Sequence, residues 1–264
     1  MDVWIWYCLL GGGAGVLAGL LGVGGGVIIV PGLCVLFAKQ QFPPGLIQHM
    51  AVGTSLACIV FTSISSMRAH HDKDFVDWRI VRKITPAILI GAFTGTWVAS
   101  SVSGRVLQWT FVVFLFSVAT QMFMTPREHV LGTKIGYGWL SVAGGLIGGL
   151  SGLVGVGGGS MIVPLLTWFR VAIRVAIGTS AAIGFFISLS GSAGSIITGL
   201  RVPGLPPLAL GYVYLPAVAG IVCLSVLTAP LGARLAHRLP VAVLRRGFGV
   251  LLFVIGGKLL MNLI

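Results

Sequence analysis

Acidic side chains are scarce in this sequence. Only 5 of its 264 residues are Asp or Glu, against 17 Lys and Arg, and charged residues make up 8% of the chain. Ordinary soluble domains carry about three times that share. The mean hydropathy is +1.05, and several apolar runs are longer than the roughly 18 residues that a membrane-spanning helix needs. These features exclude an ordinary soluble protein and predict an all-α integral membrane protein.

The few acidic residues all lie outside the predicted spans. Transporters that couple a substrate to protons or sodium commonly hold a carboxylate inside the membrane. The sequence offers none there, and His49, at the edge of a span, is the only candidate titrating group within the membrane region. The acidic residues are Asp2, Asp72, Asp74, Asp77 and Glu128.

Paired cysteines are also missing, since the four cysteines stand singly in apolar segments. Their spacing predicts neither a disulfide framework nor a metal site. The spans carry no recognisable set of nucleophile, base and metal ligands, so we expect no enzyme activity, no catalytic residue and no cofactor. The net charge of +12 comes from basic residues between the apolar runs. This placement predicts orientation against anionic lipid and argues against nucleic-acid binding.

Glycine is abundant, with 40 residues, and it is concentrated in a stretch that occurs twice. Gly15–Pro31 reads GVLAGLLGVGGGVIIVP and Gly148–Pro164 reads GGLSGLVGVGGGSMIVP, with 12 of 17 positions identical at an offset of 133. A second shared piece follows at an offset of 125: Ala51–Ala57 reads AVGTSLA and Ala176–Ala182 reads AIGTSAA. The last spans align at an offset of 137. The chain is therefore a duplicated unit.

The duplication predicts two transmembrane repeats, 1–124 and 135–264, joined by a linker at 125–134. Each begins with an apolar run of some 35 residues, at 3–37 and 135–169, which is too long for one span and too short for two. The glycines inside each run predict a helix, an elbow and a short second helix that starts inside the membrane, with Pro31 and Pro164 in its first turn. Further spans are expected at 49–66, 84–102, 106–124, 176–200, 208–231 and 241–264.

The basic residues decide between two topologies. If both broken runs cross fully, eight crossings divide Lys and Arg 8 against 8, with Lys258 left aside. If each run turns back at its elbow, 13 gather on one face and 4 on the other, as the positive-inside rule requires. We therefore expect two inverted repeats, each with a glycine-broken re-entrant helix pair plus about three transmembrane helices. The expected location is the cell's inner membrane, with both termini outside.

The glycine breaks are the predicted substrate site. A broken helix leaves backbone amides unpaired, which the membrane tolerates only where they line a cavity or pack on protein. Helix N-termini of this kind attract anions, and glycine lets an oxyanion approach closely. The alternative is that the glycines only permit close helix packing, which is the interpretation we favour for Gly15, Gly19, Gly148 and Gly152. The elbow residues assigned to the site are Gly22, Gly24, Gly25, Gly26, Gly155, Gly157, Gly158 and Gly159.

Hydroxyl and basic side chains complete the predicted site. Thr54, Ser55, Thr179 and Ser180 stand at equivalent points of both repeats, where they either donate to the anion or bond the carbonyls of their own helices. His49 and Arg174 each precede the glycine of a GTS motif by four residues. They either draw an anion toward the site or, in the case of Arg174, anchor the helix at the headgroups.

The twin LLGVGGGVIIVP and GLVGVGGGSMIVP motifs, HxxxGTS and the RAHHDKDFVDW loop resemble those of the TauE/SafE family of sulfite exporters, also called toluene sulfonate uptake permeases. The resemblance covers the full length. It implies transport of sulfite, of organosulfonates such as sulfoacetate, or of related sulfur anions, and fixes neither substrate nor direction. Arg174 departs from the pattern because the first repeat has His49 there, which makes the two halves of the site unequal.

Two functions remain open at this point. The leading hypothesis is a permease that moves a small sulfur oxyanion by alternating access between the two elbows, with export favoured because an inside-negative potential drives anions outward. The alternative is a membrane subunit or membrane enzyme whose glycine motifs only pack helices. The partners expected are the small anion and the lipid bilayer, and the sequence predicts no oligomeric state.

Overall fold

The structure is a computed structural model that describes residues 2–22, 24–123, 137–169, 171–236 and 241–263. The described part is almost entirely helical, as the sequence predicts. The helices of the first half are α1 (Asp2–Leu21), α2 (Gly26–Lys39), α3 (Pro44–His71), α4 (Trp78–Ser101) and α5 (Gly104–Phe123). Those of the second half are α6 (Tyr137–Val154), α7 (Gly159–Trp168), α8 (Ile173–Gly199), α9 (Leu215–Ala236) and α10 (Val241–Leu263). The predicted linker at 125–134 lies outside the described residues.

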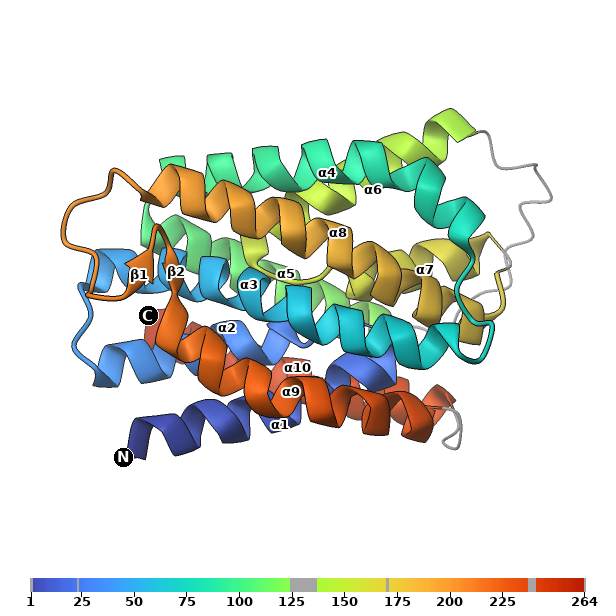
Figure 1. The fold of residues 1–264 in the computed structure, drawn as a ribbon, viewed down its shortest axis with the longest axis horizontal. Coiled ribbons are helices and arrows are strands. Elements are labelled where there is room, and N and C mark those ends of the chain that lie inside the picture. The colour runs from blue at the N-terminus through green and yellow to red at the C-terminus, as the bar shows by residue number, and fades with distance from the viewer. Residues whose placement is uncertain (1, 23, 124–136, 170, 237–240, 264) are drawn as a thin grey trace.

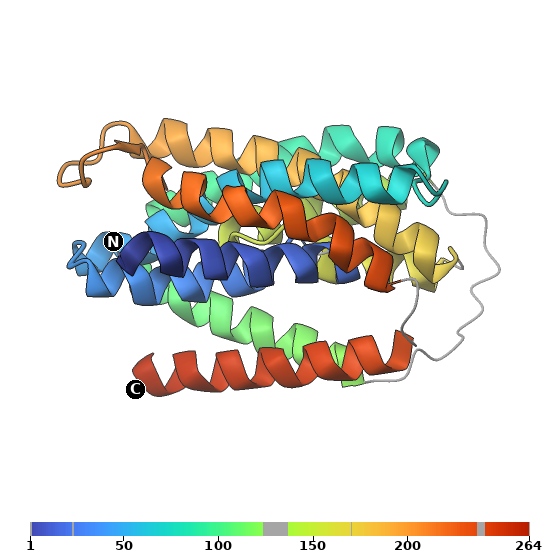
Figure 2. The same cartoon turned by 60° about the horizontal axis from the view of Figure 1, so that its bottom comes forward.

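Helices α3 and α8 form the centre of the bundle (Figure 1). They are the most buried of the membrane-length helices, with 67% and 61% of their most apolar windows buried, against 33–39% for the others. Helices α4 and α6 pack together on one flank and α1 and α9 on the other. Figure 2 shows α5 and α10 as a further pair beside this core. In the two repeats, α1 corresponds to α6 and α4 corresponds to α9. The α1–α9 and α4–α6 contacts are therefore equivalent, and each joins the two halves.

Six described helices are long and apolar enough to cross a membrane: α1, α3, α4, α5, α8 and α9. Helices α2 and α7, with 14 and 10 residues, are the short second helices that follow the two glycine breaks. Helix α1 has 20 residues, or about 30 Å at 1.5 Å per residue. This is the length that the apolar run before the first glycine break predicts, and it is enough to cross a membrane; the re-entrant arrangement stays a prediction.

Small residues hold the two flanking pairs together. The backbone of α1 at Gly11, Gly15 and Gly19 lies directly against the carbonyls of Ile221, Ser225 and Ala229 on α9. A β-carbon at any of these three glycines would collide with that backbone. Gly148 and Gly152 on α6 lie in the same way against α4. Because helices cannot gain from the hydrophobic effect inside lipid, such close contact is a main source of their association. The packing interpretation of Gly15, Gly19, Gly148 and Gly152 is confirmed.

Both chain ends lie at the same end of the bundle in both views. The α2–α3, α4–α5 and α8–α9 connections are at that end too, with Lys39, Arg105 and Arg201. The α3–α4 loop and the beginning of α8 lie at the opposite, basic end (Figure 1). The inverted relation of the repeats, and the assignment of the two ends to the outside and the inside of a cell, stay predictions.

Two local expectations were wrong. Pro31 and Pro164 are the sixth residues of α2 and α7, not first-turn residues, because the helices already begin at Gly26 and Gly159. Residues 209–214 do not belong to a span: strands β1 (Ala209–Leu210) and β2 (Val213–Tyr214) form a short antiparallel hairpin before α9.

Candidate functional site

The two glycine elbows touch each other inside the bundle. An ideal β-carbon on Gly24 would lie 3.5 Å from the Cα of Gly157, and one on Gly26 would lie 2.5 Å from the carbonyl oxygen of Gly155. The elbows come from opposite halves of the chain and were expected to meet within reach of a single ligand. The structure places them in direct contact, and glycine is required there because any side chain would separate them.

The elbows turn sharply through left-handed backbone. Gly22, Gly25, Gly155 and Gly158 have φ values of +67°, +79°, +79° and +71°, which glycine adopts freely and other residues rarely do. Gly25 and Gly158 are the residues that precede the first turns of α2 and α7, and neither helix has a side-chain cap.

Eight backbone amides at the elbows donate to no acceptor within the part of the chain that the structure describes. Among the hydrogen bonds of the described residues, none uses the N–H groups of 24–27 or of 157–160 as donor. All eight residues are buried. The first amides of a helix have no acceptor within the helix, and when such amides are buried they need a side chain, a water or a ligand as partner. They also lie at two helix N-termini, where the helix dipole favours a negative charge.

The serines of the GTS motifs hold the elbows from the opposite half. The hydroxyl of Ser55 on α3 donates to the carbonyl oxygen of Gly155 at 2.8 Å. Its counterpart Ser180 on α8 lies 3.3 Å from the carbonyl oxygen of Gly22 and 2.8 Å from that of Ile177. Only Ser180 therefore shows the bonding within its own helix that the alternative interpretation expected. Each central helix fixes the elbow of the other repeat.

The threonines of the same motifs bind the segments that lead into α9 and α4. The hydroxyl oxygen of Thr54 accepts from the amide of Tyr214 at 3.0 Å, and that of Thr179 accepts from the amide of Asp77 at 2.9 Å. The two bonds are equivalent in the two repeats. Thr54 and Thr179 are related by the repeat offset of 125, and Asp77 and Tyr214 by the repeat offset of 137. Both side chains are fully buried, so they position backbone near the elbows.

His49 is buried near the beginning of α3, beside the turn between α4 and α5. Its ring nitrogens lie 3.2 Å from the carbonyl oxygen of Gly45 and 3.0 Å from that of Val102, and the ring stacks on Tyr212 at 5.3 Å. Burial raises the pKa of the Tyr212 phenol, which keeps that ring uncharged. The imidazole of His49 thus lies between carbonyl oxygens of α3 and of the α4–α5 turn, and its N–H donates to one of them.

Arg174 is exposed at the second residue of α8. It stands in the position that His49 holds in the first repeat, yet it is not among the buried residues around the elbows. The structure therefore brings the eight elbow glycines together with Ser55 and Ser180, places Thr54 and Thr179 behind them, and leaves His49 and Arg174 outside the cluster.

Two buried hydroxyls beside the second elbow were missed by the sequence analysis. Ser160 is the second residue of α7, is 0% exposed, and its hydroxyl has no hydrogen-bond partner. Ser63 on α3 is 1% exposed and its hydroxyl also lacks a partner. A β-carbon on Gly184 would lie 3.4 Å from the Ser63 hydroxyl and 2.8 Å from the Gly157 carbonyl oxygen, which places Ser63 next to the second elbow.

The difference between the two repeats was the signal that could have revealed these residues. Ser160 is one of the five positions where the glycine motifs differ, and its counterpart is Val27. At the position of Gly184 the first repeat has Ile59, whose side chain packs directly on Gly24. The second elbow therefore has one hydroxyl more than the first at the start of its short helix, while an isoleucine side chain lies against each elbow, Ile59 at Gly24 and Ile187 at Gly158.

Comparisons with known proteins agree with this membrane architecture. The family model described as Sulfite exporter TauE/SafE matches residues 7–259. A probable membrane transporter protein of Haemophilus influenzae is 39% identical over 257 residues, covering 97% of each chain. The probable membrane transporter protein YunE of Bacillus subtilis is 28% identical over 206 residues, covering 70% of this chain and 76% of its own. No solved structure matches the chain with statistical significance.

A further relative, a probable membrane transporter protein of Xylella fastidiosa, is 32% identical over 184 residues, covering 67% of this chain and 68% of its own. The family match spans both elbows and both GTS motifs, the features around which the bundle is built. This chain therefore belongs to the TauE/SafE sulfite exporter family and is a multi-pass membrane transporter.

Proposed function

We propose that the protein is a permease for a small sulfur-containing oxyanion, such as sulfite or an organosulfonate, and that it binds the anion between the two glycine elbows. The observation that carries this proposal is the set of eight buried amides without acceptors at 24–27 and 157–160. A tetrahedral or pyramidal oxyanion presents several acceptor oxygens, which backbone amides at two adjoining helix N-termini can satisfy.

Within this site the anion binds closer to the second elbow. The unpartnered hydroxyls of Ser160 and Ser63 supply two more donors there, whereas the first elbow has Val27 in place of Ser160. Hydroxyls left without partners in a protein interior are destabilising, so an anion that accepts from them recovers that loss on binding.

Transport on this proposal alternates between the two ends of the bundle. The elbows are in contact in the structure, so the anion enters when the halves part at one end and leaves when they part at the other. Export is the proposed direction. The described spans carry no carboxylate for a coupling ion, and an inside-negative potential drives anions out. The location we propose is the cell's inner membrane, with both termini outside.

The test is thermal stabilisation of the purified protein by sulfite, by sulfoacetate and by chloride as a non-binding anion. A ligand at 100 times its dissociation constant stabilises the folded state by about 2.7 kcal/mol. The variants are Ser160→Val, which installs the residue of the first repeat, and Ser63→Ala. Both remove an unpartnered hydroxyl, so we expect melting temperatures without anion at or above that of the wild type.

Sulfur anions should raise the melting temperature of the wild type, and Ser160→Val should lose most of that rise. Ser188→Ala is the matched control, because the hydroxyl of Ser188 is the counterpart of Ser63 and donates to Phe185 of its own helix at 3.0 Å; it should keep the rise. Substitutions at Gly25 or Gly158 are less informative, because a β-carbon at either position would collide with neighbouring atoms of the protein. A loss of binding would then not be distinguishable from a loss of packing. If Ser160→Val and Ser63→Ala respond to sulfite like the wild type, the second elbow is not the site.

A further inference from the structure

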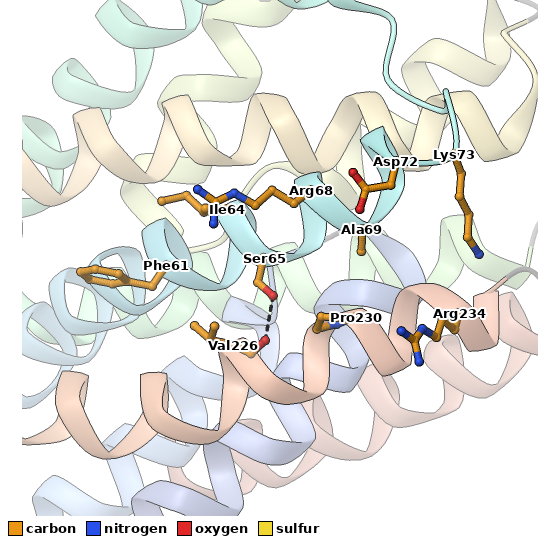
Figure 3. Close-up of a pocket in the computed structure, with 10 residues that line it drawn as sticks. All are labelled: Phe61, Ile64, Ser65, Arg68, Ala69, Asp72, Lys73, Val226, Pro230 and Arg234. Carbon is orange, nitrogen blue, oxygen red and sulfur yellow. Dashed lines mark hydrogen bonds between the residues drawn. The ribbon is translucent and has the colours of Figure 1, made fainter.

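A second feature of the molecule is a groove between α3 and α9 at the basic end of the bundle (Figure 3). Its volume is about 460 Å³. One part is apolar, formed by Phe61, Ile64, Val226 and Pro230. The other part is charged, formed by Arg68, Asp72, Lys73 and Arg234. The elbow site involves none of these residues.

The groove runs from the hydrocarbon level to the headgroup level. Phe61 precedes the end of α3 at His71 by ten residues, which is about 15 Å along the helix axis and roughly half the hydrocarbon thickness of a bilayer. Its ring is 48% exposed, so it faces lipid. Arg68 is three residues from the same end, at a depth of about 5 Å. A ligand filling the groove is therefore apolar along most of its length and polar at one end.

The charged part carries an excess of positive charge. Three cations, Arg68, Lys73 and Arg234, face one carboxylate, Asp72, which leaves two positive charges uncompensated. Among the ten lining residues, one hydrogen bond involves a side chain: the Ser65 hydroxyl donates to the carbonyl oxygen of Val226 at 2.7 Å. The cations are thus not paired with the carboxylate. In Figure 3, Arg68 lies along α3 toward Ile64, and Lys73 points toward the α9 side, where Arg234 lies.

The fold does not require these cations. The equivalent groove of the other repeat lies between α8 and α4, where Ser190 donates to the carbonyl oxygen of Leu89 at 2.7 Å, as Ser65 does to Val226. At offsets of 125 and 137, the residues equivalent to Arg68, Lys73 and Arg234 are Ala193, Thr198 and Trp97. The same helix contact therefore exists with no cation at any of the three positions.

We propose that the α3–α9 groove binds a phospholipid with an anionic headgroup. Its phosphate lies among Arg68, Lys73 and Arg234, and an acyl chain lies over Phe61, Ile64 and Pro230. Guanidinium groups bind phosphate through paired hydrogen bonds, and cationic pockets between helices on the cytoplasmic side suit such headgroups. Since α3 belongs to the first half and α9 to the second, the bound lipid bridges the two halves. This proposal is independent of the anion that the protein transports.

The experiment measures binding of defined lipids to the delipidated full-length protein in detergent, by native mass spectrometry and by thermal stabilisation. The probes are cardiolipin, phosphatidylglycerol, zwitterionic phosphatidylcholine and inorganic phosphate. The groove variant replaces Arg68, Lys73 and Arg234 with Gln. The matched control replaces Arg79, Arg82 and Arg246 with Gln; these three are exposed basic residues outside the groove, and the net charge change is the same.

The two anionic lipids should bind the wild type and the control variant, and the groove variant should bind them about a hundredfold more weakly, given three lost cations. Phosphatidylcholine should bind all three proteins weakly and equally. Equal binding of cardiolipin to the groove and control variants would overturn the proposal. So would stabilisation by inorganic phosphate as large as that by lipid, since it would identify the ligand as a free anion. The melting temperature without lipid, compared among the three proteins, shows that the groove variant is folded.

Discussion

The hydroxyl of Ser55 donates a 2.8 Å hydrogen bond to the carbonyl oxygen of Gly155, 100 positions along the chain. The bond crosses from the central helix of the first half to the elbow of the second. Ser180 makes the reciprocal contact to Gly22 at 3.3 Å. Each half therefore holds the backbone of the other half's elbow by a hydrogen bond. If an elbow moves, either this bond breaks or the helix that carries the serine moves with the elbow. This coupling suits the proposal that the two elbows bind one ligand together.

The first prediction concerns these two serines. Ser55→Ala leaves the buried carbonyl of Gly155 without its partner, and we expect a loss of about 1–3 kcal/mol in stability. Ser180→Ala should cost less, because its bond to Gly22 is longer and its hydroxyl is shared with Ile177. Thermal unfolding of the purified variants measures both.

The control for this pair is Ser117→Ala. The hydroxyl of Ser117 bonds only the Val113 carbonyl of its own helix, and the residue is exposed, so the variant should unfold within about 0.5 kcal/mol of the wild type. If Ser55→Ala were as stable as Ser117→Ala, the serine would not hold the elbow.

The second prediction tests the contact between the elbows. The β-carbon of Gly26→Ala would lie 2.5 Å from the Gly155 carbonyl oxygen and 2.8 Å from the Ile59 side chain. We expect destabilisation by about 1–3 kcal/mol, as for other overpacked interiors, and loss of flux in proteoliposomes. Gly13→Ala is the control, since no atom lies within 4 Å of its β position. Normal stability and flux in Gly26→Ala would show that the elbows need not approach so closely.

The third prediction concerns the beginning of α4. The carboxylate of Asp77 accepts from the amides of Arg79 at 2.9 Å and Ile80 at 3.3 Å, while its own amide donates to Thr179. Asp77→Ala removes this helix cap and should cost about 1 kcal/mol, and Asp77→Asn should recover most of it because asparagine caps equally well. Thermal unfolding of the two purified variants measures these losses in stability. Equal losses in the two variants would mean that the charge of Asp77 matters and its capping bonds do not.

The fourth prediction follows from the position of the acidic residues. Asp2 begins α1, and Asp72, Asp74 and Asp77 lie at or beyond the end of α3, so the described spans provide no carboxylate for a coupling ion. We expect flux to follow the membrane potential. At about 2.3 kcal/mol per charge per 100 mV, a dianion gains about twice that on leaving an inside-negative compartment, on the order of a thousandfold in concentration.

Proteoliposomes with the potential and the ion gradients clamped separately provide the measurement. Sulfite flux should rise and reverse with the potential at zero sodium and proton gradients. A flux that ignores the potential and collapses without an ion gradient would contradict export driven by the potential alone.

The repeat pattern in the sequence predicted a large part of this structure. The matched glycine breaks predicted helices that end and restart at the same internal points, and α1–α2 and α6–α7 do so. Gly15 and Gly19, four residues apart, indicated a packed helix face, and the structure has it. Periodicity and spacing are local properties of a chain, and a membrane amplifies them because every backbone group inside it needs an intramolecular partner. That requirement leaves few alternatives to helices and makes a break conspicuous.

The partners of the polar side chains were decided by the tertiary structure alone. The hydroxyls of the GTS motifs were expected to bind either an anion or the carbonyls of their own helices, but Thr54 and Thr179 bind backbone 160 and 102 positions away. His49 and Arg174 occupy equivalent positions in the sequence, yet one is buried between carbonyls and the other is exposed. A hydroxyl or imidazole can bond any group within about 3 Å, and which group lies there depends on how distant helices pack. The sequence by itself thus determined the helices, their breaks and the internal duplication, whereas packing determined which donors are used and which, as at Ser160, are left without a partner.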